Sequence, residues 1–272
     1  SPLQLPELLS AMHHILALGI DACTDWLRSS PSGLNDTSRP VRSSAVSLHI
    51  PLHRFVAFFA SQMCRYSSTE TSLARLLGVP DPKGLIRQLL SHPLRIQVLL
   101  AQIRAGVWRR NGETMLRRGW FYRSSYFYDL GLDLDIFLLQ CAAVLLPADE
   151  LVLTCVDNFE LARLLGLKAA PESTEADIAE AQMMSWDVKC TLLEDLVVMI
   201  AAVISERARL GLTDRECIRQ EVVARLSVRP MSHSQLTDSI CRRWHEHDDF
   251  EPVLLEVADY EPPKSERMEQ GK

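Results

Sequence analysis

A stretch of apolar residues between Ser91 and Gly112 constrains the fold more than any other part of the chain. Ser91 and Pro93 are typical of a helix start, because serine caps free N–H groups and an initial proline has no N–H to satisfy. Asn111 and Gly112 favour the left-handed turn that ends helices. Apolar side chains occupy most faces in between, at Leu94, Ile96, Val98, Leu99, Ala101, Ile103, Ala105, Val107 and Trp108. A helix of this kind is normally buried on several sides, so the sequence predicts a central helix over 93–110.

The rest of the chain follows the helical period and almost never alternates with the period of a strand. Caps, prolines and glycines mark the expected helix ends, for example the capping box that begins at Thr213. The other predicted helices cover 3–28, 52–66, 69–77, 81–90, 114–123, 134–146, 147–165, 187–209, 213–228, 232–243 and 248–259. No fixed-period repeat marks a helical solenoid. The predicted fold class is therefore all-α, an irregular multi-helix scaffold.

Polar stretches divide this scaffold into predicted domains. The chain begins with an N-terminal helix over 1–28 and a Pro-, Gly- and Ser-rich loop over 29–44. The helical scaffold is expected over 45–210. A winged-helix-like segment is expected over 211–272.

Composition excludes several classes of protein. The 272 residues are 47% hydrophobic and 24% charged, as in soluble globular proteins. The net charge of −6 argues against a general nucleic-acid binder, and no apolar run is long enough for a membrane helix. Seven scattered cysteines without a CxxC pair favour a reducing compartment, which predicts a cytoplasmic or nuclear protein. The start at Ser1, without an initiator methionine, suggests a piece of a longer protein.

The sequence offers weak candidates for catalysis. It contains no GxSxG, Walker, GxGxxG or HExxH motif. Cys64 lies beside an arginine, but Phe59 and Met63 favour a place in the core over a nucleophilic role. Asp133 and Asp135 precede an apolar helix and are interpreted as carboxylates at its N-terminus, not as an acid/base pair. No catalytic residue is predicted.

Three places in the sequence carry residue types that can bind a metal ion. The adjacent His13 and His14 do not share a helical face, and His49 and His53 share one only if their helix begins before Pro51. The densest cluster of ligand types holds Cys241, His245 and His247, beside Asp248 and Asp249. No fourth ligand follows at a recognisable spacing, so a polar turn is favoured and zinc is kept as an alternative.

The segment 213–259 has the order of helices of a helix-turn-helix or winged-helix core. Its arginines are partly balanced by acidic residues, whereas a DNA reader is usually more one-sidedly basic. The favoured use is docking of a protein partner. One hypothesis for the function is therefore a non-enzymatic helical adaptor that binds protein partners or DNA through 213–259.

Six short motifs, in order between about residues 45 and 260, resemble the central helical region of the UBR-family N-recognins. These are large RING-type E3 ubiquitin ligases of the N-degron pathway. The motifs are LHIPLHR at 48–54, SHPLRIQV at 91–98, AGVWRRNG at 105–112, DLDIFLLQ at 133–140, MSHSQL at 231–236 and FEPVLLEVA at 250–258.

The resemblance implies a role within a larger ligase. The zinc-binding UBR box of the family lies upstream of such a region, and the RING that recruits the E2 lies downstream. It implies as partners a ubiquitin-conjugating E2 enzyme and N-degron substrates, reached through the full-length protein. The resemblance also implies that the winged-helix-like segment over 211–272 is incomplete, with its wing strands truncated. No catalytic or substrate-binding residue, and no cofactor, carries over to this chain. The structural anchors that we expect are Arg95, Trp108, Arg109 and Arg110.

Overall fold

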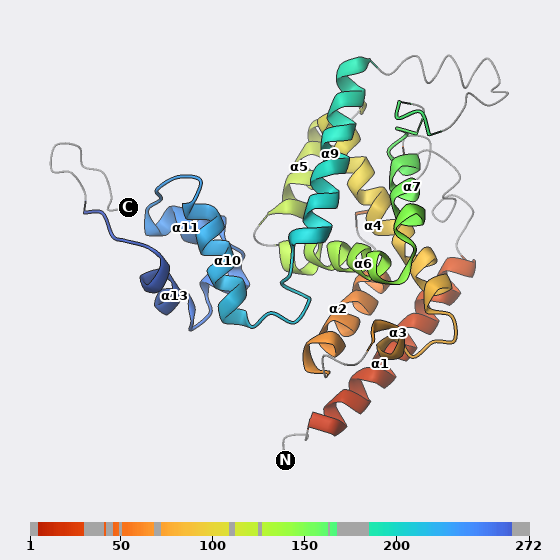
Figure 1. The fold of residues 1–272 in the computed structure, drawn as a ribbon, viewed down its shortest axis with the longest axis horizontal. Coiled ribbons are helices and arrows are strands. Elements are labelled where there is room, and N and C mark those ends of the chain that lie inside the picture. Colours follow the sequence, from red (N-terminus) through yellow and green to blue (C-terminus); the bar gives the residue numbers. More distant parts are fainter. Residues whose placement is uncertain are drawn as a thin grey trace. The chain divides into compact units, whose positions relative to one another are not determined.

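The computed structural model describes residues 5–29, 41, 46–48, 51–67, 72–108, 112–124, 127–162, 164–167 and 185–262. Helices are the only regular secondary structure in these ranges, and none of the residues within them forms a strand (Figure 1). The prediction of an all-α fold is confirmed. Most of the predicted loop 29–44 lies outside the described residues.

The chain forms two compact units that are discontinuous in sequence. The first unit holds Ser1–Gly119 and Leu134–Glu206, and the second holds Trp120–Asp133 and Arg207–Lys272. The sequence placed a boundary near residue 210, but it gave no sign that 120–133 would join the C-terminal unit.

The first unit is a set of helices of very unequal length. α1 packs on α2, and α4 packs on α7 and α9 (Figure 1). The bounds are α1 (Leu5–Ser29), α2 (Pro51–Tyr66), α3 (Leu73–Leu77), α4 (Pro82–Arg104), α5 (Gly112–Arg123), α6 (Leu132–Leu145), α7 (Ala148–Asn158) and α9 (Trp186–Ser205). The division between the units falls inside α5 and near the start of α6.

The long helix α4 replaces two predicted helices. Asp81 caps it by accepting a hydrogen bond from the Gly84 N–H at 2.9 Å. The predicted helix start at Pro93 is wrong, because Pro93 lies inside α4. An interior proline costs about 3 kcal/mol through its missing N–H and the clash of its ring. His92, Pro93 and Leu94 are all buried, and the packing of this stretch offsets the cost.

The C-terminal end of α4 also differs from the prediction. The helix ends at Arg104, not near residue 110. Gly106, with φ of 74°, adopts the left-handed conformation that the sequence had suggested for Gly112. Gly112 instead begins α5. A glycine just inside the apolar stretch was thus the true stop signal.

Other predicted helices extend too far along the chain. α7 ends at Asn158 and α9 at Ser205, several residues before the predicted ends. The predicted helix over 232–243 is two short helices, because the main chain is extended at Ile240.

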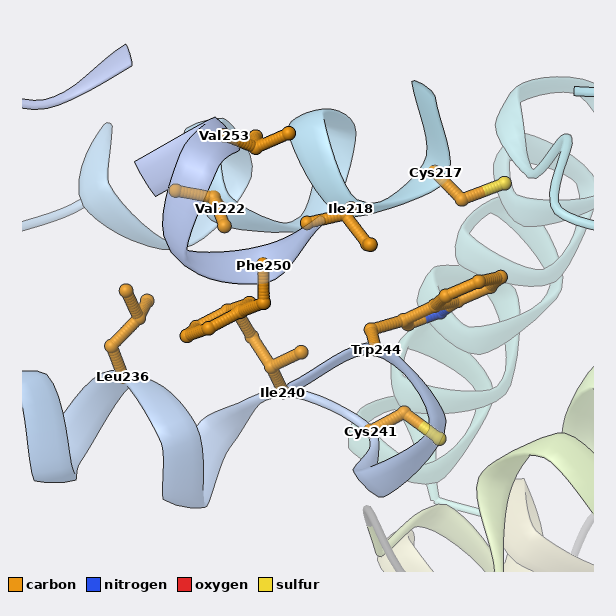
Figure 2. Close-up of a cluster of buried hydrophobic side chains, with 9 residues drawn as sticks. All are labelled: Cys217, Ile218, Val222, Leu236, Ile240, Cys241, Trp244, Phe250 and Val253. Carbon is orange, nitrogen blue, oxygen red and sulfur yellow. The ribbon is translucent and has the colours of Figure 1, made fainter. Parts of the chain in front are cut away.

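The second unit contains η2 (Tyr128–Leu130), α10 (Asp214–Leu226), α11 (His233–Ser239), α12 (Arg242–His245) and α13 (Phe250–Val257). The predicted capping box at Thr213 is confirmed, and Ser232 with Gln235 forms a second one at the start of α11. Its core gathers nine buried side chains from these helices and their connections (Figure 2). They are Cys217, Ile218, Val222, Leu236, Ile240, Cys241, Trp244, Phe250 and Val253.

We expect Gly78→Ala to lower the free energy of unfolding by about 1–2 kcal/mol, the cost of a left-handed conformation in a residue with a β-carbon. Gly78 ends α3 with φ of 64°. Gly78→Asn is the matched control, because asparagine tolerates this conformation and places the same β-carbon against the exposed His13. Urea denaturation should show a smaller loss for asparagine; equal losses would contradict the explanation.

Candidate functional site

The residues that carry the strongest motifs meet in the core of the first unit. Arg54 on α2 donates from Nε to Asp135 Oδ1 at 3.2 Å and from Nη2 to Oδ2 at 2.7 Å. Its Nη1 donates to the Leu48 carbonyl oxygen at 2.6 Å. Arg54 and Asp135 are both buried. This paired, charge-assisted geometry joins α2 to the first turn of α6.

A cluster of rings lies beside this ion pair. The ring centroids of His53 and His92 are 4.2 Å apart, and both rings lie against Trp26 on α1. The sulfur of Cys23 lies 3.6 Å from His53 Nδ1. The cluster therefore joins α1, α2 and α4, and it uses a histidine from each of two motifs.

Both histidines are held neutral. Burial, followed by the neighbouring His92 and Arg54, lowers the pKa of His53 to about 3. Burial and Arg95 lower the pKa of His92 to about 4. His92 Nε2 is buried without a hydrogen-bond partner. A proton has no favourable place in this cluster, so it is suited to structure and not to general acid/base catalysis.

These pKa values predict a pH dependence of stability. Both lie below the ordinary value of 6.5, so the unfolded chain takes up protons first as the pH falls. The stabilisation is complete above about pH 6.5 and declines by about 1.4 kcal/mol per pH unit for each histidine below it. Urea unfolding at about pH 7 and about pH 5.5 measures the slope.

The double variant His53→Gln and His92→Gln should show a shallower slope over the same range. His14→Gln, at an exposed site on α1, is the control and should keep the slope of the parent. A slope that is unchanged in the double variant would contradict the assignment.

The expected anchors have different surroundings. Arg95 is 2% exposed, which makes it one of the largest fully buried side chains described. Trp108 lies beyond α4, and its Nε1–H donates to Gln102 Oε1 at 3.2 Å. Arg109 and Arg110 lie outside the described residues. An anchoring function for these residues stays a prediction.

A second buried ion pair lies in the second unit. Arg209, beyond α9, donates from Nε to Asp133 Oδ2 at 2.5 Å and from Nη2 to the Asp129 carbonyl oxygen at 2.6 Å. Burial raises the pKa of Asp133, although Arg209 acts in the opposite direction. Asp133 and Asp135 do lie in the first turn of α6, but each carboxylate is bound to a buried arginine, which the sequence alone did not indicate.

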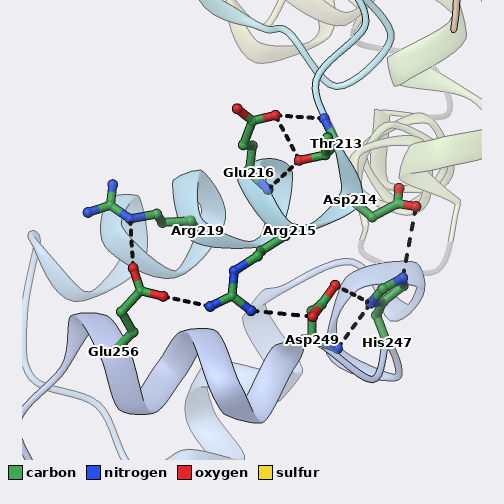
Figure 3. Close-up of polar contacts among 8 residues, drawn as sticks. All are labelled: Thr213, Asp214, Arg215, Glu216, Arg219, His247, Asp249 and Glu256. Carbon is green, nitrogen blue, oxygen red and sulfur yellow. Dashed lines mark hydrogen bonds and ion pairs between the residues drawn. The ribbon is translucent and has the colours of Figure 1, made fainter.

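The arginines that suggested nucleic-acid binding are largely paired with acids. Arg215 contacts Asp249 at 3.3 Å and Glu256 at 2.7 Å, and Arg219 lies 3.8 Å from Glu256 (Figure 3). The same figure shows His247 near Asp249 and Asp214. Further pairs are Arg225 with Glu221, Arg242 with Glu246 and Arg243 with Asp214. Positive charge neutralised in this way offers little to a phosphate backbone.

The candidate zinc ligands Cys241, His245 and His247 are not placed together as a metal site. The Cys241 thiol is buried, and burial raises its pKa. His245 Nδ1 lies 3.1 Å from the Ile240 carbonyl oxygen, and His247 Nδ1 accepts from the Asp249 N–H at 3.1 Å. In the part of the chain that the structure describes, no group of three histidine, cysteine or acidic residues is placed to hold a metal ion.

All seven cysteines are free; five are buried, Cys64 is half-buried and Cys190 is exposed. Burial raises the pKa of the Cys64 thiol, so this candidate nucleophile stays protonated. Burial also raises the pKa of Cys23 to about 12 and that of Cys155 to about 11.

Among the described helices, none is long and apolar enough to cross a membrane.

Comparison with known families accounts for most of the chain. Residues 36–184 match the UBR1/2/3-like ARM repeat domain, and residues 217–272 match the winged-helix domain of E3 ubiquitin-protein ligase UBR1-like proteins. The sequence showed no fixed period in the region described as ARM repeats. Its helices α2 to α7 range from 5 to 23 residues, which obscures a period in the sequence.

Individual relatives agree. The chain is 30% identical to E3 ubiquitin-protein ligase PRT6 of Arabidopsis thaliana over 87% of its length, and 31% identical to human UBR3 over 93%. It is 25% identical to human UBR1 over 87%. It covers only 12% to 13% of these relatives, which is about an eighth of their length.

Proposed function

Because the chain belongs to the UBR1/2/3-like family, we propose that it is the central scaffold segment of an E3 ubiquitin-protein ligase that recognises N-terminal degrons. In the full-length protein it holds a substrate-receptor module and an E2-binding RING module. A substrate lysine then meets the ubiquitin thioester on the E2. The contribution to transfer is one of proximity and orientation.

The observation that carries this proposal is the buried polar network of the first unit. Three motif segments supply it: 48–54, 91–98 and 133–140. Their charged and polar side chains contact one another and main-chain carbonyls away from solvent. Residues that tie four helices together support a rigid spacer, not a reaction centre.

The test uses the full-length ligase with Asp135→Asn, which weakens the buried pair with Arg54. A positional role predicts slower ubiquitylation of a substrate with a basic N-terminal residue. Binding of the N-terminal peptide should be unchanged, and so should discharge of ubiquitin from the E2 to free lysine, because other modules perform both.

Asp187→Asn, at an exposed position in the first turn of α9, is the control and should leave all three readouts unchanged. Undiminished substrate ubiquitylation in Asp135→Asn, despite a measured loss of stability, would argue against the scaffold role. Loss of peptide binding or of E2 discharge would instead place an active function in this segment.

The proposal extends to partners, cofactor and compartment. The partners are an E2 enzyme and N-degron substrates, and the zinc belongs to the UBR box and RING of the full-length protein. Seven free cysteines support a cytoplasmic or nuclear location, which fractionation of cells that express the tagged full-length protein would test. The comparisons do not favour the alternative of an adaptor without a ligase.

A further inference from the structure

The second unit contains a cavity lined mainly by polar residues, which has no part in the proposed scaffold role. Its volume is about 620 Å³, and residues from the end of α5, from α11 and from α12 line it. The wall combines one large aromatic side chain with hydroxyl, carboxylate, imidazole and guanidinium groups. Its hydrogen-bonding character can be worked out group by group.

The three hydroxyl groups of the wall present lone pairs. Ser124, Thr237 and Ser239 each donate a hydrogen bond to the main-chain carbonyl oxygen three residues earlier, at 2.7, 3.0 and 2.8 Å. A hydroxyl has one hydrogen to donate. What remains for a ligand is therefore acceptor capacity.

The ionisable groups of the wall add acceptors. His245 Nδ1 lies 3.1 Å from the Ile240 carbonyl oxygen, which can only accept, so Nδ1 carries a hydrogen, and in that tautomer Nε2 is an acceptor. Asp238 presents an exposed carboxylate. The Nε–H of Arg242 is bound to Glu246 Oε1 at 2.8 Å, so these two charges offset each other.

Trp120 supplies the apolar part of the wall. Its side chain is 70% exposed, although an indole is usually at least half-buried in a folded protein. The face of an indole attracts cations, and it stacks well with the planar guanidinium group. An acceptor-rich wall with one excess negative charge and an exposed indole is complementary to a planar donor.

We propose that this cavity binds an arginine side chain from within a partner protein. The guanidinium group stacks on Trp120 and donates to Asp238 and to the lone pairs of the hydroxyl groups. Its rigid fork of donors matches several acceptors at once, which an ammonium group matches less well. This site is additional to the scaffold role and does not depend on it.

The test is a titration of the ¹⁵N-labelled chain with N-acetyl-L-arginine amide, which has no free α-amino group. The indole N–H resonance of Trp120, identified by its absence in Trp120→Phe, should shift and saturate. N-acetyl-L-citrulline amide has nearly the same shape without the charge, and it should bind at least about tenfold more weakly, since charge-assisted hydrogen bonds are roughly twice as strong as neutral ones.

Asp238→Asn should weaken arginine binding by about threefold to fivefold, the range for loss of an exposed charge pair. Asp259→Asn changes an exposed aspartate of the same unit outside the cavity, and it should leave binding unchanged. Thermal unfolding of both variants confirms that they are folded.

Three results would overturn the proposal. The first is a Trp120 resonance that shifts no more than that of Trp186, which is similarly exposed at 67% on α9. Citrulline amide binding as tightly as arginine amide would remove the role of charge. Equal binding by Asp238→Asn and Asp259→Asn would remove the cavity as the site.

Discussion

Asp135→Ala is expected to destabilise the first unit by about 3–5 kcal/mol, the usual cost of leaving a buried charge without its partner. The two side chains of the pair are 9% and 3% exposed, so water cannot replace the lost carboxylate around Arg54. The hydrogen bond from Arg54 to the Leu48 carbonyl oxygen would remain. Denaturation in urea, followed by circular dichroism, measures the change.

A double replacement separates the charge from the packing. Arg54→Met combined with Asp135→Leu removes both charges and keeps apolar volume, so it should destabilise less than Asp135→Ala alone. Glu113→Ala breaks an exposed pair with Arg117 on α5 and should leave the denaturation midpoint unchanged. A double variant as unstable as the single one would show that shape, not charge, dominates at this site.

Phe250→Ala is expected to destabilise the second unit by about 3–5 kcal/mol, through lost burial and the cavity left behind. Phe250 is 1% exposed at the centre of the cluster in Figure 2, between Ile218 and Ile240. The unit is small, so this loss is a large part of its stability. We expect the unit to unfold while the helices of the first unit remain folded.

Hydrogen exchange followed by mass spectrometry distinguishes the units. Peptides from α10 and α13 should lose protection in Phe250→Ala, and peptides from α4 should keep it. Leu255→Ala is the matched control on the same helix, because Leu255 is 81% exposed. Loss of protection in α4 as well would show that the two units fold as one cooperative body.

The winged-helix-like segment shows how far local signals reach. The capping box at Thr213 could be predicted because its two residues are three apart in sequence, and the structure contains it. The break at Ile240 was not readable, since no proline or glycine marks it. Burial of Ile240 and Trp244 in one core stabilises the extended conformation there. Helix existence followed from local pattern, and helix ends depended on packing.

The candidate site divides in the same way. Arg54 and Asp135 each lay in a motif, but they are 81 residues apart, and nothing in the spacing paired them. The zinc cluster was the reverse case: Cys241, His245 and His247 are near in sequence, yet their donor atoms have other partners or are buried. Proximity along the chain does not give ligand geometry.

The stretch from Ser91 to Gly112 shows most clearly what can be predicted from the sequence alone and what cannot. Its apolar pattern by itself determined that a buried helix would form there, because the periodicity of side chains depends on only a few neighbouring residues. Only the tertiary structure decided that this helix continues through Pro93 and ends at Arg104. The energy that overrides a local stop signal comes from side chains buried against distant helices, and such contacts are collective.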